Sequence, residues 1–180
     1  AVVPQKAVLF EGTIRSNLLM GNPNASEAEL FAALETAQAA EIVRTKPNGI
    51  DEPVLRGGSN FSGGQKQRLS IARALVHGGR ILILDDSASA LDFATDAKLR
   101  AAIRKLSPAP TTFIVSKRAA SVMFADFIIV LDEGRAVGQG THEELLRNCA
   151  VYREIYASQF PDEAAKLNVP NNTPEGGASK

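Results

Sequence analysis

Two adjacent carboxylates end a run of branched apolar residues. The run is Ile81-Leu82-Ile83-Leu84, and Asp85 and Asp86 follow it directly. A buried strand that delivers a carboxylate to the edge of a parallel sheet is a common way to hold Mg²⁺ against a nucleotide phosphate. The same pair could instead cap the turn that follows the strand. This stretch alone favours neither interpretation.

A second group, Ser62-Gly63-Gly64-Gln65, stands at the start of a predicted helix. Glycines let backbone N–H groups approach an anion closely, and the positive end of the helix dipole points to the same place. The hydroxyl of Ser62 adds a further donor. The alternative is an ordinary helix N-cap with flexible glycines, which is the commoner meaning of a bare Ser-Gly-Gly.

The segments around these residues alternate between strand and helix patterns. Strands separated by helices and buried on both faces imply a parallel sheet with crossover helices, so the predicted class is α/β. The predicted elements are a helix from about Gly64 to Val76, a strand Ile81–Leu84, a helix Ala94–Leu106, a strand Thr111–Val115, a short helix Ala119–Phe124 and a strand Phe127–Leu131.

The first third of the chain has a different pattern. Apolar residues from Leu30 to Val43 follow a helical period, and Ser26 with Glu29 forms a capping box just before them. The stretch Pro47–Asn60 is dense in Gly, Pro, Asn and Asp, which predicts a loop.

After the last predicted strand, the pattern indicates a hairpin and further helices. Residues 132–135 predict a turn into a short strand at 136–138, and Thr141 with Glu144 caps a helix that runs to Leu146. A further helix is predicted near Tyr152–Gln159. Residues 161–180 are polar and without period, which predicts a disordered tail or a linker.

Length, charge and cysteine content limit the function classes. The chain has 180 residues, 44% of them hydrophobic, which is enough for one globular domain. Lys plus Arg is 20 and Asp plus Glu is 20, so no overall field attracts nucleic acid or an anionic membrane surface. The single Cys149 excludes an internal disulfide framework and reads as a buried or idle thiol. Without a signal peptide or a membrane-length apolar run, this segment is expected to be soluble by itself.

Taken together and in this order, the motifs resemble the ATP-binding cassette (ABC) of membrane transporters. "FSGGQKQR" matches the signature motif, "ILILD" the Walker B strand, "SALD" the D-loop and "VPQ" the Q-loop. Two longer stretches, at residues 9–21 and 132–146, are similar to the exporter branch of the family. The resemblance covers roughly residues 2–160 and implies a partial P-loop NTPase-like domain with a mostly parallel sheet and an α-helical subdomain.

The resemblance also implies domains, ligands and roles. Residues 1–79 would hold the Q-loop, the helical subdomain and the signature helix, and residues 80–160 the remaining catalytic core. ATP and Mg²⁺ are the implied cofactors. The implied residues are Ser62, Gly63, Gly64, Gln65, Ser89 and Asp92 at the nucleotide, Asp85 and Gln5 at the metal, and Gln5, Asp86 and Lys117 at the hydrolytic centre.

One expected motif does not occur. No G-x-x-x-x-G-K-S/T pattern is present, so the phosphate-cradling Walker A loop and its lysine are missing from these residues. In the family that loop lies upstream of the Q-loop, so we expect a chain truncated before it and an isolated fragment that is inactive. Phe61 also replaces the leucine that usually begins the signature.

The two hydrolytic positions depart from the family pattern. Asp86 stands where hydrolysing members usually carry Glu, and its stem is one methylene shorter; misplacements near 1 Å can cost about 100-fold in rate. Lys117 aligns with the family's switch His, and an ammonium only donates hydrogen bonds, whereas imidazole can also accept them. Lys117 alone could be a solvated charge at a strand end. With Asp86, it indicates a degenerate site that holds ATP more than it cleaves it.

In this family two cassettes pair head to tail, so each ATP lies between one Walker site and the other chain's signature. The intact signature here would then serve a non-identical partner cassette, which together with transmembrane domains forms an exporter at the cytoplasmic face of the membrane. Two alternatives remain at this point. One is a soluble ABC ATPase without a membrane partner, and the other is a regulatory module that dimerises on ATP without hydrolysis.

Overall fold

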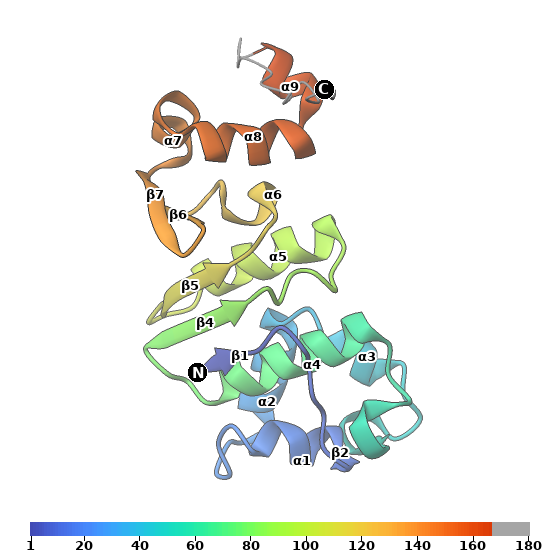
Figure 1. Cartoon of the computed structure of the whole chain (residues 1–180). Helices are drawn as coiled ribbons and strands as arrows, with labels where there is room; N and C mark the ends of the chain where they lie inside the picture. The colour runs from blue at the N-terminus through green and yellow to red at the C-terminus, as the bar shows by residue number, and fades with distance from the viewer. Residues whose placement is uncertain (167–180) are drawn as a thin grey trace. The chain divides into compact units, whose positions relative to one another are not determined.

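The computed structural model describes residues 1–166 and divides the chain into two compact units (Figure 1). The first unit is Ala1–Lys117, and the second begins at Arg118. The predicted boundary between residues 79 and 80 stays a prediction about functional subdomains. Packing joins the two sides of that boundary, because the first strand of the chain pairs with the strand that follows residue 80.

The first unit is built around a three-stranded parallel sheet in the order β1-β4-β5. Its strands are β1 (Val2–Val3), β4 (Ile81–Asp85) and β5 (Thr111–Val115). Val3 lies opposite Leu84, and Asp85 lies opposite Val115. The predicted α/β class with a parallel sheet is therefore confirmed, and β4 and β5 match the predicted strands.

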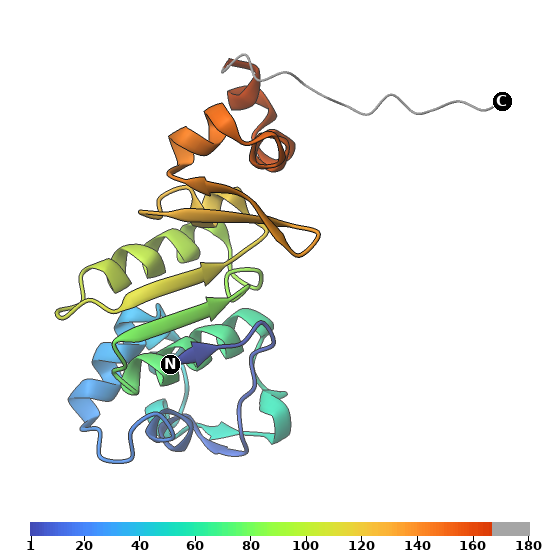
Figure 2. The same cartoon turned by 60° about the vertical axis from the view of Figure 1, so that its left-hand side comes forward.

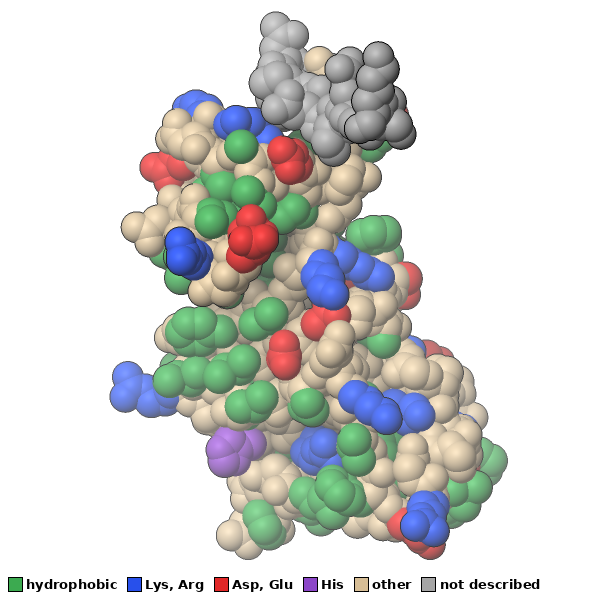
Figure 3. Space-filling view, viewed as in Figure 1, with side chains coloured by type: hydrophobic (Ala, Val, Ile, Leu, Met, Phe, Trp, Pro, Cys, Tyr) green, Lys and Arg blue, Asp and Glu red, His purple; other side chains and the backbone are tan. Residues whose placement is uncertain are grey.

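One face of this sheet is packed and the other is open. Leu82 and Leu84 belong to the same buried cluster as Ile71 of α4 (Gly63–Val76) and Leu99 of α5 (Phe93–Arg104). The opposite face carries exposed apolar side chains, and hydrophobic side chains gather over the strands in Figure 3. They include Val2, Ile81, Phe113 and Val115, which are 62%, 52%, 56% and 55% exposed.

The predicted helix between Leu30 and Val43 is wrong as a single helix. The structure has two, α2 (Glu27–Thr36) and α3 (Ala40–Arg44), with Gln38 in the left-handed region at φ 58°. Arg68 donates to the Gln38 carbonyl at 2.9 Å and holds the break. Apolar periodicity continues across the break because both helices bury residues in one core.

The remaining elements of the first unit are short. Thr13 caps α1 (Ile14–Leu19), and β2 (Gly12–Thr13) pairs antiparallel with β3 (Pro53–Val54). The predicted loop at residues 47–60 thus contains a short strand, together with the 3₁₀ turns η1 (Gly49–Asp51) and η2 (Arg56–Gly58). The capping box of Ser26 and Glu29 is present as predicted.

The second unit contains a hairpin and four helices in its described part (Figure 2). Strands β6 (Ile128–Asp132) and β7 (Arg135–Gly140) are antiparallel, and Glu133 and Gly134 both have positive φ, as a two-residue hairpin turn requires. The helices are α6 (Ala119–Val122), α7 (His142–Asn148), α8 (Ala150–Gln159) and α9 (Pro161–Lys166).

The last helix corrects one prediction. Residues 161–166 form α9 where the sequence predicts a disordered tail, because Ala164 is buried and Tyr156 of α8 donates a hydrogen bond to Glu163 at 2.6 Å. Residues 167–180 lie outside the described part of the chain. Among residues 1–166, no helix is long and apolar enough to cross a membrane.

Candidate functional site

The carboxyl end of β4 holds the two adjacent carboxylates. Asp85 is the last residue of the strand and its side chain is exposed. Asp86 has a left-handed backbone, with φ 43°, and its N–H donates to the Val115 carbonyl at 2.8 Å. Asp tolerates this conformation better than most residues do. The chain therefore turns sharply here while staying tied to β5.

Gln5 reaches the same place from the loop after β1. Its Nε2 donates to Oδ2 of Asp86 at 2.9 Å, although the two residues are 81 positions apart. Parallel pairing of β1 with β4 explains the contact, since both strands end at the same edge of the sheet. The structure thus brings together two residues that the sequence assigns to one site.

These groups fit a magnesium ion that is held mainly by phosphate. Asp85 and Gln5 offer oxygen ligands, which Mg²⁺ prefers, and Mg²⁺ at a nucleotide commonly takes only one or two protein carboxylates. Among the described residues, no group of three or more His, Cys, Asp or Glu could hold a metal ion. When bound, the ion would supply positive charge against the phosphates.

The D-loop residues make local hydrogen bonds. Ser89 Oγ donates to the Asp86 carbonyl at 2.7 Å, which fixes the turn after β4. Asp92 is the N-cap of α5: it accepts from the Thr95 N–H and from the Thr95 hydroxyl, both at 2.8 Å. The Thr95 backbone N–H is the main cause that lowers the pKa of Asp92. Both side chains therefore stabilise the local backbone, and their contact to nucleotide stays a prediction.

The signature residues begin α4 as a reciprocal capping box. The Gln65 N–H donates to Ser62 Oγ at 3.3 Å, and the Ser62 N–H donates to Gln65 Oε1 at 2.9 Å. Ser62 accepts in this arrangement, so its hydroxyl proton stays free of the cap. The N–H groups of Gly63 and Gly64 have no intrahelical partner in the first turn. This geometry suits an anion and equally satisfies the simple N-cap interpretation.

The two signature glycines have different surroundings. A Cβ at Gly63 would have nothing within 4 Å, whereas a Cβ at Gly64 would lie 3.0 Å from the Ala90 carbonyl oxygen in the D-loop. The start of α4 therefore approaches the segment that follows Asp86. The signature and the Walker B carboxylates belong to the same edge of the sheet.

Lys117 leaves the sheet at this edge too. It lies two residues beyond the end of β5, whose last residue, Val115, is paired with Asp85, and its side chain is exposed. The structure thus confirms the strand that precedes Lys117. Its contact to a γ-phosphate stays a prediction.

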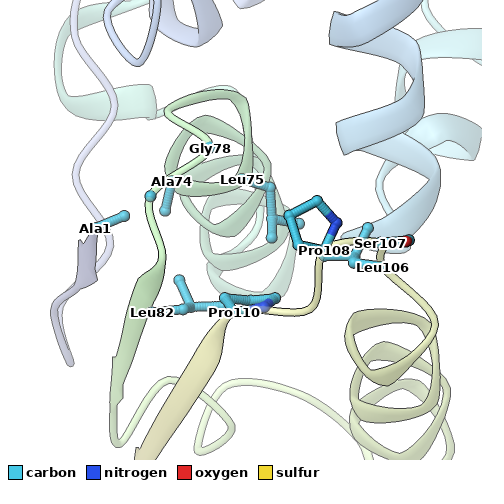
Figure 4. Close-up of a pocket in the computed structure, with 10 residues that line it drawn as sticks. Ala1, Ala74, Leu75, Gly78, Leu82, Leu106, Ser107, Pro108 and Pro110 are labelled. Atoms are coloured by element: carbon cyan, nitrogen blue, oxygen red, sulfur yellow. The ribbon is translucent and has the colours of Figure 1, made fainter.

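An apolar hollow of about 220 Å³ lies at the other end of the strands (Figure 4). It is lined by Leu82 near the start of β4, by Pro110 just before β5, and by Ala1, Gly79, Leu106 and Pro108 among others. The carboxylates are at the opposite ends of these strands. This hollow is therefore separate from the candidate nucleotide site.

Sequence reasoning missed the role of Asn17. Its side chain is 2% exposed and bonds to Phe10 twice, accepting from the N–H and donating to the carbonyl, both at 2.8 Å. It also donates to the Thr13 carbonyl at 2.9 Å, which closes the loop after the Q-loop segment. The sequence did offer one signal for this role: Asn17 is a polar residue next to Leu18 on the apolar side of a short helix.

Comparison with known proteins shows which family this chain is similar to. The ABC transporter family model matches residues 1–89. An ABC transporter ATP-binding protein of Bacillus subtilis, YfiB, is 46% identical over 164 residues, which is 91% of this chain and 28% of that protein. A solved structure of a bacterial Atm1-family ABC exporter with ATP bound matches 88% of this chain with a TM-score of 0.85 and 40% identity. This chain belongs to the ABC transporter family and is similar to the ATP-binding domains of its exporters.

The relatives of this ABC domain fragment include transporters with a stated cargo. An ATP-dependent lipid A-core flippase of Saccharophagus degradans is 39% identical over 160 residues, which is 89% of this chain and 27% of that protein. The chain thus spans little more than a quarter of the length of the relatives it matches, 28% for YfiB and for the Atm1-family exporter. Membership of the ABC ATPase family implies that the domain binds ATP.

Proposed function

We propose that, within the whole protein, this ABC domain fragment is part of the ATP-binding unit that powers an exporter. Binding of ATP with Mg²⁺ would close two cassettes head to tail, and that closure would switch the transmembrane domains between inward and outward access. The observation that carries the proposal is the Gln5–Asp86 hydrogen bond beside Asp85 at the carboxyl end of β4. The likeness to an Atm1-family exporter and to lipid A-core flippases supports the exporter class.

In this proposal the chain's own Walker B site holds ATP more than it cleaves it. Asp85 and Gln5 would hold the magnesium ion, and Asp86 would take the position of the base that orients the attacking water. Its short side chain already accepts a hydrogen bond from Gln5 on a backbone tied to Val115. Lys117 would add positive charge near the γ-phosphate, and its ammonium group donates hydrogen bonds without accepting them.

The signature half of the chain serves the partner's ATP. Ser62, Gly63, Gly64 and Gln65 keep the full motif, and the first turn of α4 presents N–H donors and a positive dipole end to an anion. Ser89 and Asp92 shape the D-loop at the interface. The partner cassette would carry Glu after its Walker B aspartate and His at its switch. The assembly would lie with its cassettes at the cytoplasmic face of the membrane.

Single-turnover ATP hydrolysis by the assembled transporter tests the asymmetry. Asp86→Ala should leave turnover within about twofold, because the hydrolytic base acts in the other site. Replacing the glutamate after the partner's Walker B aspartate should slow turnover by about 100-fold or more, the usual range for a lost general base. Asp86→Glu is the matched control, and it should speed hydrolysis at this site.

The opposite pattern contradicts the asymmetric arrangement. If Asp86→Ala abolished turnover while the partner's glutamate could be removed without effect, this chain's own site would be the active one. If the assembled transporter released no phosphate at all while its cassettes still closed on ATP, the proposed function in ATP-driven export would be wrong.

A further inference from the structure

The aromatic ring that begins the signature carries a cation on its face. Phe61 is 5% exposed and belongs to the buried cluster of the first unit. Lys46 Nζ lies over this ring, 4.8 Å from its centroid. A cation within about 6 Å of an aromatic face is attracted to the ring, and the attraction grows where water is partly excluded. This pair therefore links the segment after α3 to the start of the signature.

The backbone of Lys46 is held at both of its hydrogen-bonding groups. Its N–H donates to the Val43 carbonyl of α3 at 3.1 Å, and its carbonyl accepts from the Gly49 N–H of η1 at 3.1 Å. Lys46 itself is only partly exposed. Its side chain therefore reaches Phe61 from a fixed turn between α3 and η1.

The backbone around Phe61 is fixed as well. The Phe61 N–H donates to the Gly58 carbonyl at 3.0 Å. The side chain of the preceding residue, Asn60, donates to the Pro53 carbonyl of β3 at 2.8 Å. Ser62, the N-cap of α4, follows Phe61 directly through a planar peptide bond. Anything that moves the Phe61 ring therefore also moves the residue that begins α4.

We propose that Lys46 is a positioning residue for the signature. By holding the Phe61 ring, Lys46 fixes Ser62 in the place where it meets the partner's ATP. Leucine, which usually begins the signature, could fill the same buried place but has no aromatic face to attract a cation. The inference rests on the proposed function, in which the signature serves the partner's ATP. It adds a residue that lies outside all the motifs quoted from the sequence.

ATP hydrolysis by the assembled full-length transporter, measured against ATP concentration, tests this role. Lys46→Met keeps the length of the side chain and removes its charge, so the half-saturating ATP concentration should rise about fivefold. The maximal rate should stay within about twofold, because excess ATP compensates for weaker binding. Lys46→Arg keeps a cation and should stay within about twofold of the unchanged protein in both values. Lys98→Met is the matched control, since Lys98 is exposed on α5 and loses the same charge.

A double-mutant cycle with Phe61→Leu separates action through the ring from action of the charge alone. If Lys46 acts through the ring, adding Lys46→Met to Phe61→Leu should change the half-saturating ATP concentration by less than about 1.5-fold. Full additivity of the two effects would overturn the proposal, and so would an unchanged half-saturating concentration in Lys46→Met. The absence of any ATP-dependent phosphate release from the unchanged transporter would instead refute the proposed function.

Hydrogen exchange with a milder variant keeps the proposal testable if Lys46→Met does not assemble. Lys46→Gln removes the charge and keeps a polar side chain, so amides of the segment 61–66 should exchange about threefold faster than in the unchanged transporter without ATP. Equal exchange in the two proteins would overturn the proposal, because the signature would then keep its place without the cation.

Discussion

At the scale of single residues, Asp86 shows how backbone and side chain constrain each other. Its left-handed φ of 43° suits Asp, and two backbone groups fix it: its N–H bonds to Val115, and its carbonyl accepts from Ser89. A longer carboxylate at this position would have to adopt the same backbone conformation, which Glu tolerates less well. The residue type that the backbone favours is thus the one with the shorter reach.

Asp92 gives a residue-scale prediction about stability and pH. Asp92→Ala removes both acceptors at the start of α5, so the thermal midpoint should fall by about 2–4 °C at neutral pH. Folding lowers the pKa of Asp92 from its usual 3.8, so its contribution is complete above that pH and is lost as the pH falls through the lowered value. The difference between the two proteins should therefore shrink as the pH falls through this lowered pKa.

Thermal melts of both proteins at several pH values check this. Asp92→Asn is the control, because it keeps an oxygen acceptor for the Thr95 N–H while it no longer titrates. A thermal-midpoint difference for Asp92→Ala that stays constant down to pH 2, which is about two units below the usual pKa of Asp, would contradict the capping role.

At the scale of elements, the start of α4 meets two demands at once. Gly63 faces open space, where a ligand could approach, and Gly64 faces the Ala90 carbonyl. Glycine is therefore favoured at these two positions of the motif for different physical reasons. The Gly64 contact links the signature helix to the D-loop inside one chain.

Replacing each glycine by alanine separates these reasons. Gly64→Ala places a Cβ 3.0 Å from the Ala90 oxygen, so either the helix or the D-loop must shift, and we expect a loss of about 1 kcal/mol in unfolding free energy. Gly63→Ala is the matched control. It meets nothing within 4 Å and should be neutral or stabilising by up to about 1 kcal/mol.

Urea unfolding of the two variants measures the difference between them. Equal stability of Gly63→Ala and Gly64→Ala would show that the D-loop yields without cost. A larger loss in Gly63→Ala would contradict the assignment of the two glycines.

At the scale of the whole molecule, the open face of the parallel sheet stands out. Parallel sheets are normally covered on both faces, and a contiguous apolar patch on a surface is uncommon in a soluble monomer. Here Val2, Ile81, Phe113 and Val115 are all more than half exposed on strands that lie side by side. The other sheet face is packed by α4 and α5.

The exposed sheet face should bind a fluorescent apolar dye when the 180-residue chain is studied alone. Changing Phe113 and Val115 to Thr keeps β propensity and should lower the dye signal roughly twofold, because it removes much of the patch. Phe93→Thr is the control: Phe93 is 65% exposed and lies on α5 instead of the sheet. An equal drop in both variants would mean that the dye does not select the sheet face.

The sequence by itself determined the elements and the chemistry that depend on neighbours in the chain. Strands β4 and β5, helix α4 and the capping boxes at Ser26 and Thr141 follow from periodicity and from groups three residues apart. The signature and Walker B motifs were recognisable because their spacing is local. The ABC exporter class followed from their order and agrees with the relatives found.

Only the tertiary structure decided how distant segments meet. Gln5 contacts Asp86 because β1 and β4 pair in parallel, and Gln38 breaks a periodic helix because Arg68 holds its carbonyl. Helix α9 forms where the sequence is polar, since a few buried contacts to α8 outweigh weak local preference. Contacts between residues tens of positions apart depend on the packed core, and no local pattern encodes them.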